Sequence, residues 1–182
     1  MQLLEEMQAG VGDDKLIVAK DGGGFYNDTK YVNTLFMSDC YCSCYRCTAW
    51  TETDASTCVG QISAAIEAGK RGQVVFMHGE ANQADKPAAP EQQTFTFALA
   101  AYLVAAQENS FFGYSNGWYY NGSKWWAEYD RPLGAPLEEA VLVGRSVHEG
   151  VYTRRFEHAT VHLDVAGYNA SIDWAAAPSR AN

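Results

Sequence analysis

The sequence predicts an α/β fold: a mainly parallel sheet of about four strands, followed by a C-terminal antiparallel β-hairpin. Short continuous runs of apolar residues recur through residues 1–114, and such runs are typical of strands buried on both faces. Segments with apolar residues at helical spacing lie between several of these runs, and strands that alternate with helices form parallel sheets. Beyond residue 150, apolar and polar residues alternate with period two, which is typical of antiparallel strands.

The elements of residues 1–114 are expected in the order helix, strand, strand, helix, strand, helix, strand. The first helix has Leu3, Leu4 and Met7 on one face and ends at the glycines that follow. The strands end in polar or glycine-rich segments, where functional loops usually lie. The strands are expected at 15–19, 34–37, 73–77 and 110–114, and the later helices at 57–69 and 91–107.

Residues 115–182 differ in composition and are expected to pack on the same domain. Residues 115–126 form a loop of aromatic residues separated by turn formers, and 132–137 is extended because of its two prolines. Glu149-Gly150 predicts a tight turn within a hairpin, followed by strands at 151–157 and 160–165. Two or three antiparallel strands therefore close the chain.

The charge balance argues against a nucleic-acid partner. The chain has 22 acidic and 13 basic residues, a net charge of −9, and its basic residues are scattered. The longest apolar run, 97–106, is about half of what a membrane span needs, so no transmembrane segment is expected. The first residues lack the basic and apolar regions of a signal peptide, which predicts that a leader has been removed or that the chain begins inside a larger protein.

Five cysteines, four of them within eight residues, leave three alternatives. They form disulfides in an oxidising compartment, hold a metal or iron–sulfur centre, or remain free thiols in a loop. Only Cys44 and Cys47 have a spacing typical of metal ligands, and no second pair exists, so no metal and no cofactor is expected. We favour disulfides, with one thiol left over because five is odd. The disulfide candidates are Cys40, Cys42, Cys44, Cys47 and Cys58.

Three N-glycosylation sequons support the same compartment. They begin at Asn27, Asn121 and Asn169, in polar segments that are expected to be exposed. Sequons and cysteines together favour an extracellular or luminal location.

Two segments near the C-terminus carry a resemblance to a known family: 128–137, EYDRPLGAPL, and 151–161, VYTRRFEHATV. They are similar to the C-terminal end of glycoside-hydrolase-like TIM-barrel proteins, in which an aromatic barrel strand leads to a PLG-P segment and then to a hairpin. The strands at 15–19, 34–37 and 73–77 are likewise similar to the second half of such a barrel. The resemblance implies a partial (β/α) barrel over residues 1–114, with a site at the C-terminal ends of its strands.

The resemblance also implies a pair of carboxyl groups, because glycoside hydrolysis uses one as an acid and the other as a nucleophile or base. Asp39, directly after its strand, matches the later acid of the family, although relatives often carry Glu there. The earlier acid would lie upstream of Met1, and Asp21 replaces it only if the glycine loop after it folds inward. From the residues alone, Asp39 is alternatively a loop-capping residue and Asp21 a plain turn residue.

Further side chains suit the binding of a carbohydrate. His78 and Glu80 could bind sugar hydroxyls at the pocket mouth, whereas two potential metal ligands without a third are a weak metal signal. A set of aromatic residues could stack on sugar rings, or alternatively form a hydrophobic plug or an interface with another chain. This set is Trp118, Tyr119, Tyr120, Trp125 and Trp126. Arg154, Arg155 and Glu157 are expected to form ion pairs on the surface of a strand.

Three functions remain open at this point. The chain is a glycoside-hydrolase-like barrel portion, a non-catalytic subunit that docks a half-barrel onto another protein chain, or a secreted carbohydrate-binding module. A standard barrel has about 250 residues, so the missing acid would lie in a shortfall of roughly 70 residues. If the native chain begins at Met1, hydrolysis through a full carboxylate pair is not expected, and another chain would cover the open sheet edge. The sequence therefore leaves catalysis open and favours a carbohydrate or another protein chain as partner.

Overall fold

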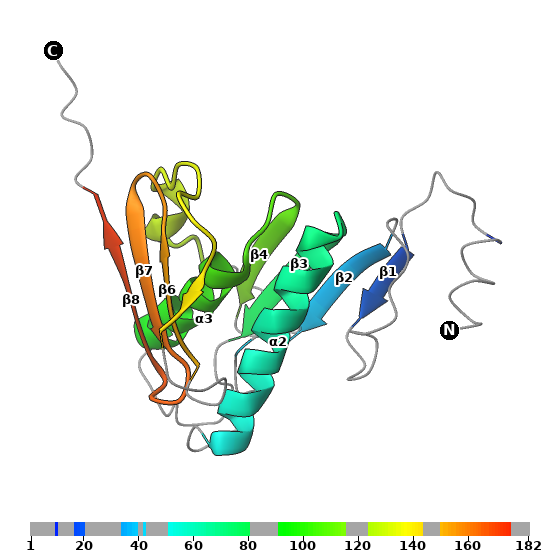
Figure 1. Cartoon of the computed structure of the whole chain (residues 1–182), viewed down its shortest axis with the longest axis horizontal. Coiled ribbons are helices and arrows are strands. Elements are labelled where there is room, and N and C mark those ends of the chain that lie inside the picture. Colours follow the sequence, from blue (N-terminus) through cyan, green and yellow to red (C-terminus); the bar gives the residue numbers. More distant parts are fainter. Residues whose placement is uncertain are drawn as a thin grey trace, which may run out of the picture.

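Two sheets with two helices between them make up the described part of the chain (Figure 1). The structure is a computed structural model, and it describes residues 10, 17–20, 34–39, 42, 51–80, 91–115, 124–143 and 150–175. For 17–20, 34–39 and Glu80 the description is of the backbone alone. The first predicted helix, at Leu3 to Met7, lies outside these residues.

The first sheet is parallel and has its strands in the order of the sequence. It consists of β1 (Ile17–Lys20), β2 (Thr34–Asp39), β3 (Val74–Glu80) and β4 (Ser110–Ser115), each paired with the next. The mainly parallel sheet predicted from the apolar runs is thus confirmed. Strands β2 and β3 continue past the residues where their apolar runs end, because backbone pairing extends to Asp39 and Glu80.

Helix α2 (Glu52–Lys70) begins earlier than the apolar pattern indicates. Its start is fixed by a capping box, in which the Thr51 side chain accepts from the Asp54 backbone and the Asp54 carboxylate accepts from the Thr51 N–H. The apolar stripe predicts a start at residue 57, because the first turn of the helix is polar and exposed and does not contribute to the stripe. The capping residues therefore mark the N-terminus better than the hydrophobic spacing does.

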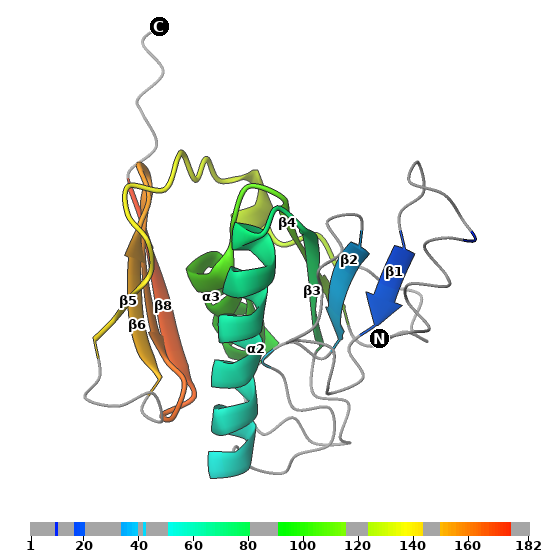
Figure 2. The ribbon, with the colours of Figure 1, turned by 45° about the vertical axis from the view of Figure 1, so that its right-hand side comes forward.

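Helix α3 (Glu91–Ala105) is the centre of the molecule, with the parallel sheet on one side and the antiparallel sheet on the other (Figure 2). Its buried residues lie all round the helix, as expected for a helix that is covered on opposite sides. Ala98, Ala100 and Ala101 are fully buried, and their small side chains let the neighbouring layers approach closely. Phe95 and Phe97 are the largest fully buried side chains of this helix.

The second sheet is antiparallel and consists of β5 (Val141–Leu142), β6 (Val151–Arg155), β7 (Ala159–Asp164) and β8 (Asn169–Trp174), in that order. The predicted antiparallel closure is confirmed, but as four strands rather than a hairpin or three strands. Along β7, Ala159, Val161 and Leu163 are buried and the residues between them are more exposed, so one face of the sheet packs on α3. The predicted tight turn at Glu149-Gly150 lies mostly outside the described residues, which resume at Gly150.

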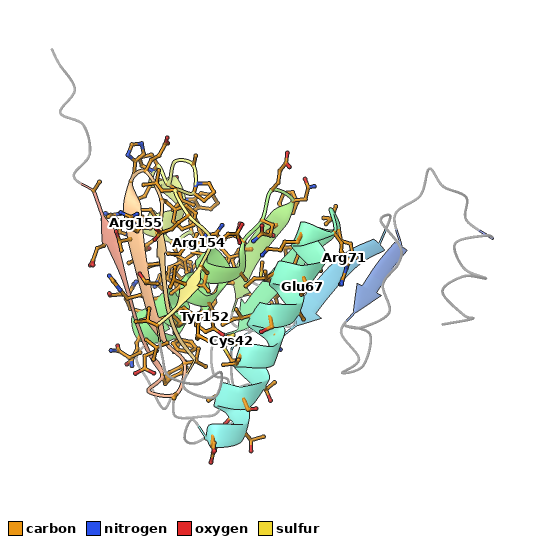
Figure 3. All side chains as sticks on the ribbon, in the orientation of Figure 1. Cys42, Glu67, Arg71, Tyr152, Arg154 and Arg155 are labelled. Atoms are coloured by element: carbon orange, nitrogen blue, oxygen red, sulfur yellow. A yellow bond between two sulfur atoms is a disulfide. The ribbon has the colours of Figure 1, made fainter. Side chains whose placement is uncertain are left out.

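Arg154 ties this sheet to the end of α3 (Figure 3). Its side chain is 3% exposed, and its Nη1 donates to the carbonyls of Leu103 at 2.9 Å, Val104 at 3.2 Å and Ala106 at 2.6 Å. The expectation of a surface ion pair is therefore wrong for Arg154, because the alternation of β6 turns this residue toward the helix. A buried cation at this place stabilises the carbonyl-rich C-terminus of α3.

Arg155 and Glu157 do lie at the surface, and Arg155 forms an ion pair there, as expected. Arg155 donates from Nε and Nη2 to the two carboxylate oxygens of Glu138 at 3.0 and 2.8 Å. This pairing lowers the pKa of Glu138. The Glu157 carboxylate accepts the backbone N–H of Ala135 and so holds the extended segment that pairs with Phe156 at the end of β6.

A disulfide between Cys42 and Cys58 joins the segment after β2 to helix α2. Both residues are buried, and the Cys42 N–H also donates to the Gln61 side chain at 2.8 Å. The prediction of disulfides is confirmed for this pair. Cys40, Cys44 and Cys47 lie outside the described residues.

None of the helices in the described residues is long and apolar enough to span a membrane.

Candidate functional site

The candidate site is the edge of the parallel sheet at which β2, β3 and β4 end. Asp39 is the register partner of His78, and Glu80 is the register partner of Ser115. Register partners on neighbouring strands belong to the same face of a sheet, as do residues two apart on one strand. Positions 39, 78, 80 and 115 therefore share one face at the carboxyl edge.

This face is the one that points away from the helices. Val75 and Met77 are fully buried on the other face, and a Cβ added to Gly79 would meet the Ala98 side chain of α3 at 2.9 Å. Gly79 therefore sits where β3 and α3 approach most closely, and its neighbours His78 and Glu80 belong to the opposite face. The close contact between Gly79 and Ala98 therefore fixes the distance between this end of β3 and helix α3.

His78 is held in place by two contacts. Its Nε2 lies 2.9 Å from the Ser115 hydroxyl of β4, and its ring is parallel to that of Phe76 with a centroid distance of 6.5 Å. The side chain is 7% exposed. The sequence placed His78 and Glu80 in a loop after the strand, whereas both are strand residues, so a rigid element positions them.

Ser115 is a site residue that the sequence interpretation missed. It is the last residue of β4, and its hydroxyl orients the imidazole of His78. The available signal was its position, because it is a polar residue at the end of an apolar run, as Asp39 is at the end of β2.

The adjacent residues Trp125 and Trp126 have opposite environments. Trp126 is 3% exposed and stacks on Phe95 with a centroid distance of 4.0 Å. Trp126 therefore fits the hydrophobic plug rather than a sugar platform, because Phe95 covers one ring face and the Lys124 ammonium lies 4.0 Å from the centroid. Trp125 is 69% exposed.

Two tyrosines join the same aromatic cluster and remain protonated at neutral pH. Tyr114, near the end of β4, and Tyr129 both meet the Phe95 ring edge-on. Burial raises the pKa of Tyr114, and it raises the pKa of Tyr129 to about 12. These phenols therefore support the edge by packing and do not serve as bases.

Most of the remaining candidate residues from the sequence lie outside the described part of the chain. Asp21, Trp118, Tyr119, Tyr120, Asn27 and Asn121 lie outside the described residues. Asn169 is exposed at the first position of β8, as expected for a glycosylation site. Within the described side chains, no group of three or more His, Cys, Asp or Glu residues is arranged to hold a metal ion.

The family is shown by comparison with known proteins. Residues 4–160 match the model of hypothetical glycosyl hydrolase family 15, GHL15. The chain belongs to this family. No curated protein matches the chain.

Membership in GHL15 confirms the resemblance that the C-terminal motifs indicate. The matched residues include the whole parallel sheet, helices α2 and α3, and strands β5 and β6, and the match ends at the start of β7. The candidate edge therefore lies well inside the part of the chain that the family shares.

Proposed function

We propose that the chain is a carbohydrate-active, glycoside-hydrolase-like protein whose site is the carboxyl edge of β2, β3 and β4. The family match supports the class of protein, and the arrangement of the sheet supports the place. Four parallel strands in sequential order, with α2 and α3 on one face, are the arrangement of consecutive units in a (β/α) barrel. In that architecture the face away from the helices is the barrel interior, and active sites lie at the carboxyl ends of the strands.

The observation that carries this proposal is the register of Asp39 beside His78. Glycoside hydrolysis uses two carboxyl groups, and Asp39 and Glu80 are carboxylic residues on adjacent strands at this edge. Their Cα atoms are one strand apart across the sheet and two residues apart along the strand, which gives a separation of roughly 8 Å. That separation is compatible with the distances between carboxyl groups in retaining and inverting enzymes.

Each residue then has a defined role in the proposal. Asp39 is the general acid or the stabiliser of the developing charge, and Glu80 is the second carboxyl group. His78, oriented by Ser115, donates or accepts a hydrogen bond with a sugar hydroxyl. Since strands rather than loops carry all four residues, the site is preorganised.

The test is the hydrolysis of a panel of aryl glycosides and natural glycans by the protein and its Asp39→Asn and Glu80→Gln variants. We expect either change to lower kcat by roughly a hundredfold or more, because each removes a proton-transfer group and keeps the shape of the side chain. Asp173→Asn is the matched control, because that carboxylate is exposed on β8 in the other sheet. Asp39→Asn activity equal to that of the unchanged protein would remove Asp39 from the mechanism.

Binding separates the catalytic proposal from a purely binding role. Protein that retains glycans on an array and hydrolyses none of them would be a carbohydrate-binding relative without catalysis. Protein that neither binds nor hydrolyses any glycan would overturn the carbohydrate function altogether.

A further inference from the structure

The sequon at Asn169 is the one of the three that lies in the described part of the chain. It consists of Asn169, Ala170 and Ser171 at the start of β8, and both its asparagine and its serine are exposed. A glycan on the Asn169 side chain would therefore extend from the surface without displacing a core residue.

The residues next to Asn169 fix the direction in which its side chain points. The Tyr168 ring packs on Phe97 of α3 with a centroid distance of 4.3 Å, and Ala170 packs against the core. Successive side chains of a strand point to opposite faces of the sheet. Asn169 therefore belongs to the outer face of the antiparallel sheet, the one that points away from α3.

A shallow groove with a volume of about 320 Å³ crosses this outer face. Asn169 is the register partner of Asp164, and Asp164 is that of Val151. The Val143 N–H, directly after β5, donates to the Val151 carbonyl at 2.7 Å. The row from 169 to 143 thus spans three strand spacings, or roughly 14 Å. The polar side chains of the neighbouring row also line the groove: Ser171, His162 and Thr153.

The end of this groove that lies away from Asn169 is apolar and exposed. Val143 is 60% exposed, and Val141 on the same face is 48% exposed. Helix α3 packs on the opposite face, and none of the other described helices or strands covers these valines (Figure 2). Since β5 is also an edge strand, exposed apolar side chains here favour association with other chains unless something shields them.

We propose that Asn169 carries an N-linked glycan whose first sugars lie along the groove and shield Val143 and Val151. The groove suits such an occupant, because it offers polar groups near the attachment point and an apolar surface beyond them. The Cys42–Cys58 disulfide is typical of the secreted proteins in which sequons are modified. The proposal is independent of the carbohydrate function proposed above.

The attachment is a transfer from a lipid-pyrophosphate-linked oligosaccharide. The Asn169 side-chain nitrogen forms a bond to the anomeric carbon of the first sugar, and the bond from that carbon to the pyrophosphate oxygen breaks. The lipid pyrophosphate leaves, and the amide nitrogen loses one proton.

Peptide mass spectrometry of the protein from its natural source tests the attachment. Trypsin cleaves after Arg155 and Arg180, and the resulting peptide, 156–180, contains Asn169 as its only asparagine. We expect the peptide to carry sugars, and peptide N-glycosidase in heavy-oxygen water to convert Asn169 to a labelled aspartate. A natural protein with this peptide entirely unmodified would overturn the proposal.

Methyl NMR of the protein secreted from eukaryotic cells tests the position of the sugars. We expect removal of the glycan to shift the methyl signals of Val143 and Val151 and to leave those of the buried Val104 of α3 unchanged. Because the enzyme leaves an aspartate, Asn169→Asp is the matched control and should give the spectrum of the deglycosylated protein. Shifts confined to residues 164 and 169 would show that the glycan points into solvent, and would overturn the shielding.

Two substitutions at the third position of the sequon separate the glycan from the side chain. Ser171→Thr keeps the sequon and should keep both the glycan and the valine signals of the glycosylated protein. Ser171→Ala removes the sequon, and we expect it to raise the binding of an apolar dye by roughly twofold or more, because the valines become exposed. Val143→Thr in the same background should lower that binding again. Equal dye binding by the Ser171→Ala and Ser171→Thr proteins would contradict the shielding.

Discussion

Arg154 connects two elements that are far apart in the sequence. It lies on β6, and its guanidinium ends among the last carbonyls of α3, which the helix itself leaves without donors. Burial lowers its pKa, but an arginine side chain stays charged in proteins. One side chain thereby joins the antiparallel sheet to the central helix and satisfies the end of that helix.

We predict that Arg154→Met destabilises the protein by about 2–4 kcal/mol, because it leaves buried carbonyls without donors. Chemical denaturation measures the change. Arg155→Met is the control, since Arg155 is exposed and forms a surface ion pair with Glu138, and it should shift the denaturation midpoint little. Equal effects of the two variants would show that the carbonyl contacts contribute nothing specific.

At the scale of elements, the spacing between β3 and α3 depends on two small residues. Gly79 faces Ala98 across the layers, and a Cβ at position 79 would lie 2.9 Å from both the Ala98 Cβ and the Tyr114 ring. Strand and helix backbone are close here, so a larger residue forces the layers apart. The strand end that carries His78 and Glu80 would move with them.

We predict that Gly79→Ala destabilises the protein by about 1–3 kcal/mol through this overpacking. Gly60→Ala is the opposite case, because Gly60 is exposed within α2 and an added Cβ meets nothing within 4 Å. There the change should stabilise the protein by about 0.5–1 kcal/mol, since alanine is the better helix former. Thermal melting of both variants tests the pair, and stabilisation by both would contradict the close contact.

At the scale of the whole molecule, burial of tyrosines couples stability to alkaline pH. The pKa of Tyr129 rises from 10.0 to about 12 on folding, and burial also raises those of Tyr102, Tyr114, Tyr152 and Tyr168. The folded state therefore prefers the protonated phenols. This contribution to stability is complete below pH 10 and is lost as the pH rises through 12.

We predict that tyrosine ionisation does not change the free energy of unfolding up to about pH 10 and lowers it above that pH. Denaturation curves at increasing pH, followed together with tyrosinate absorbance, measure both quantities. Tyr129→Phe should make the decline shallower, because the variant has one phenol fewer to ionise. A decline of the same slope in the variant would show that Tyr129 does not contribute.

The sequence by itself determined the classes of element and the family. Continuous apolar runs marked the parallel strands, because strands covered on both faces have no polar side, and period-two alternation marked β7. The motifs EYDRPLGAPL and VYTRRFEHATV indicated the glycoside-hydrolase-like family that the match over residues 4–160 shows. The cysteine cluster indicated disulfides, of which Cys42–Cys58 is present.

Only the tertiary structure decided which side chains face which surroundings. Trp125 and Trp126 are adjacent and identical in type, yet one is exposed and the other buried, because packing on Phe95 accommodates a single indole. Arg154 and Arg155 differ in the same way, since alternation along β6 turns one toward α3 and the other toward Glu138. Ser115 orients His78 only because β3 and β4 are in register. Local pattern fixes the period of an element, whereas burial depends on distant partners that no local pattern contains.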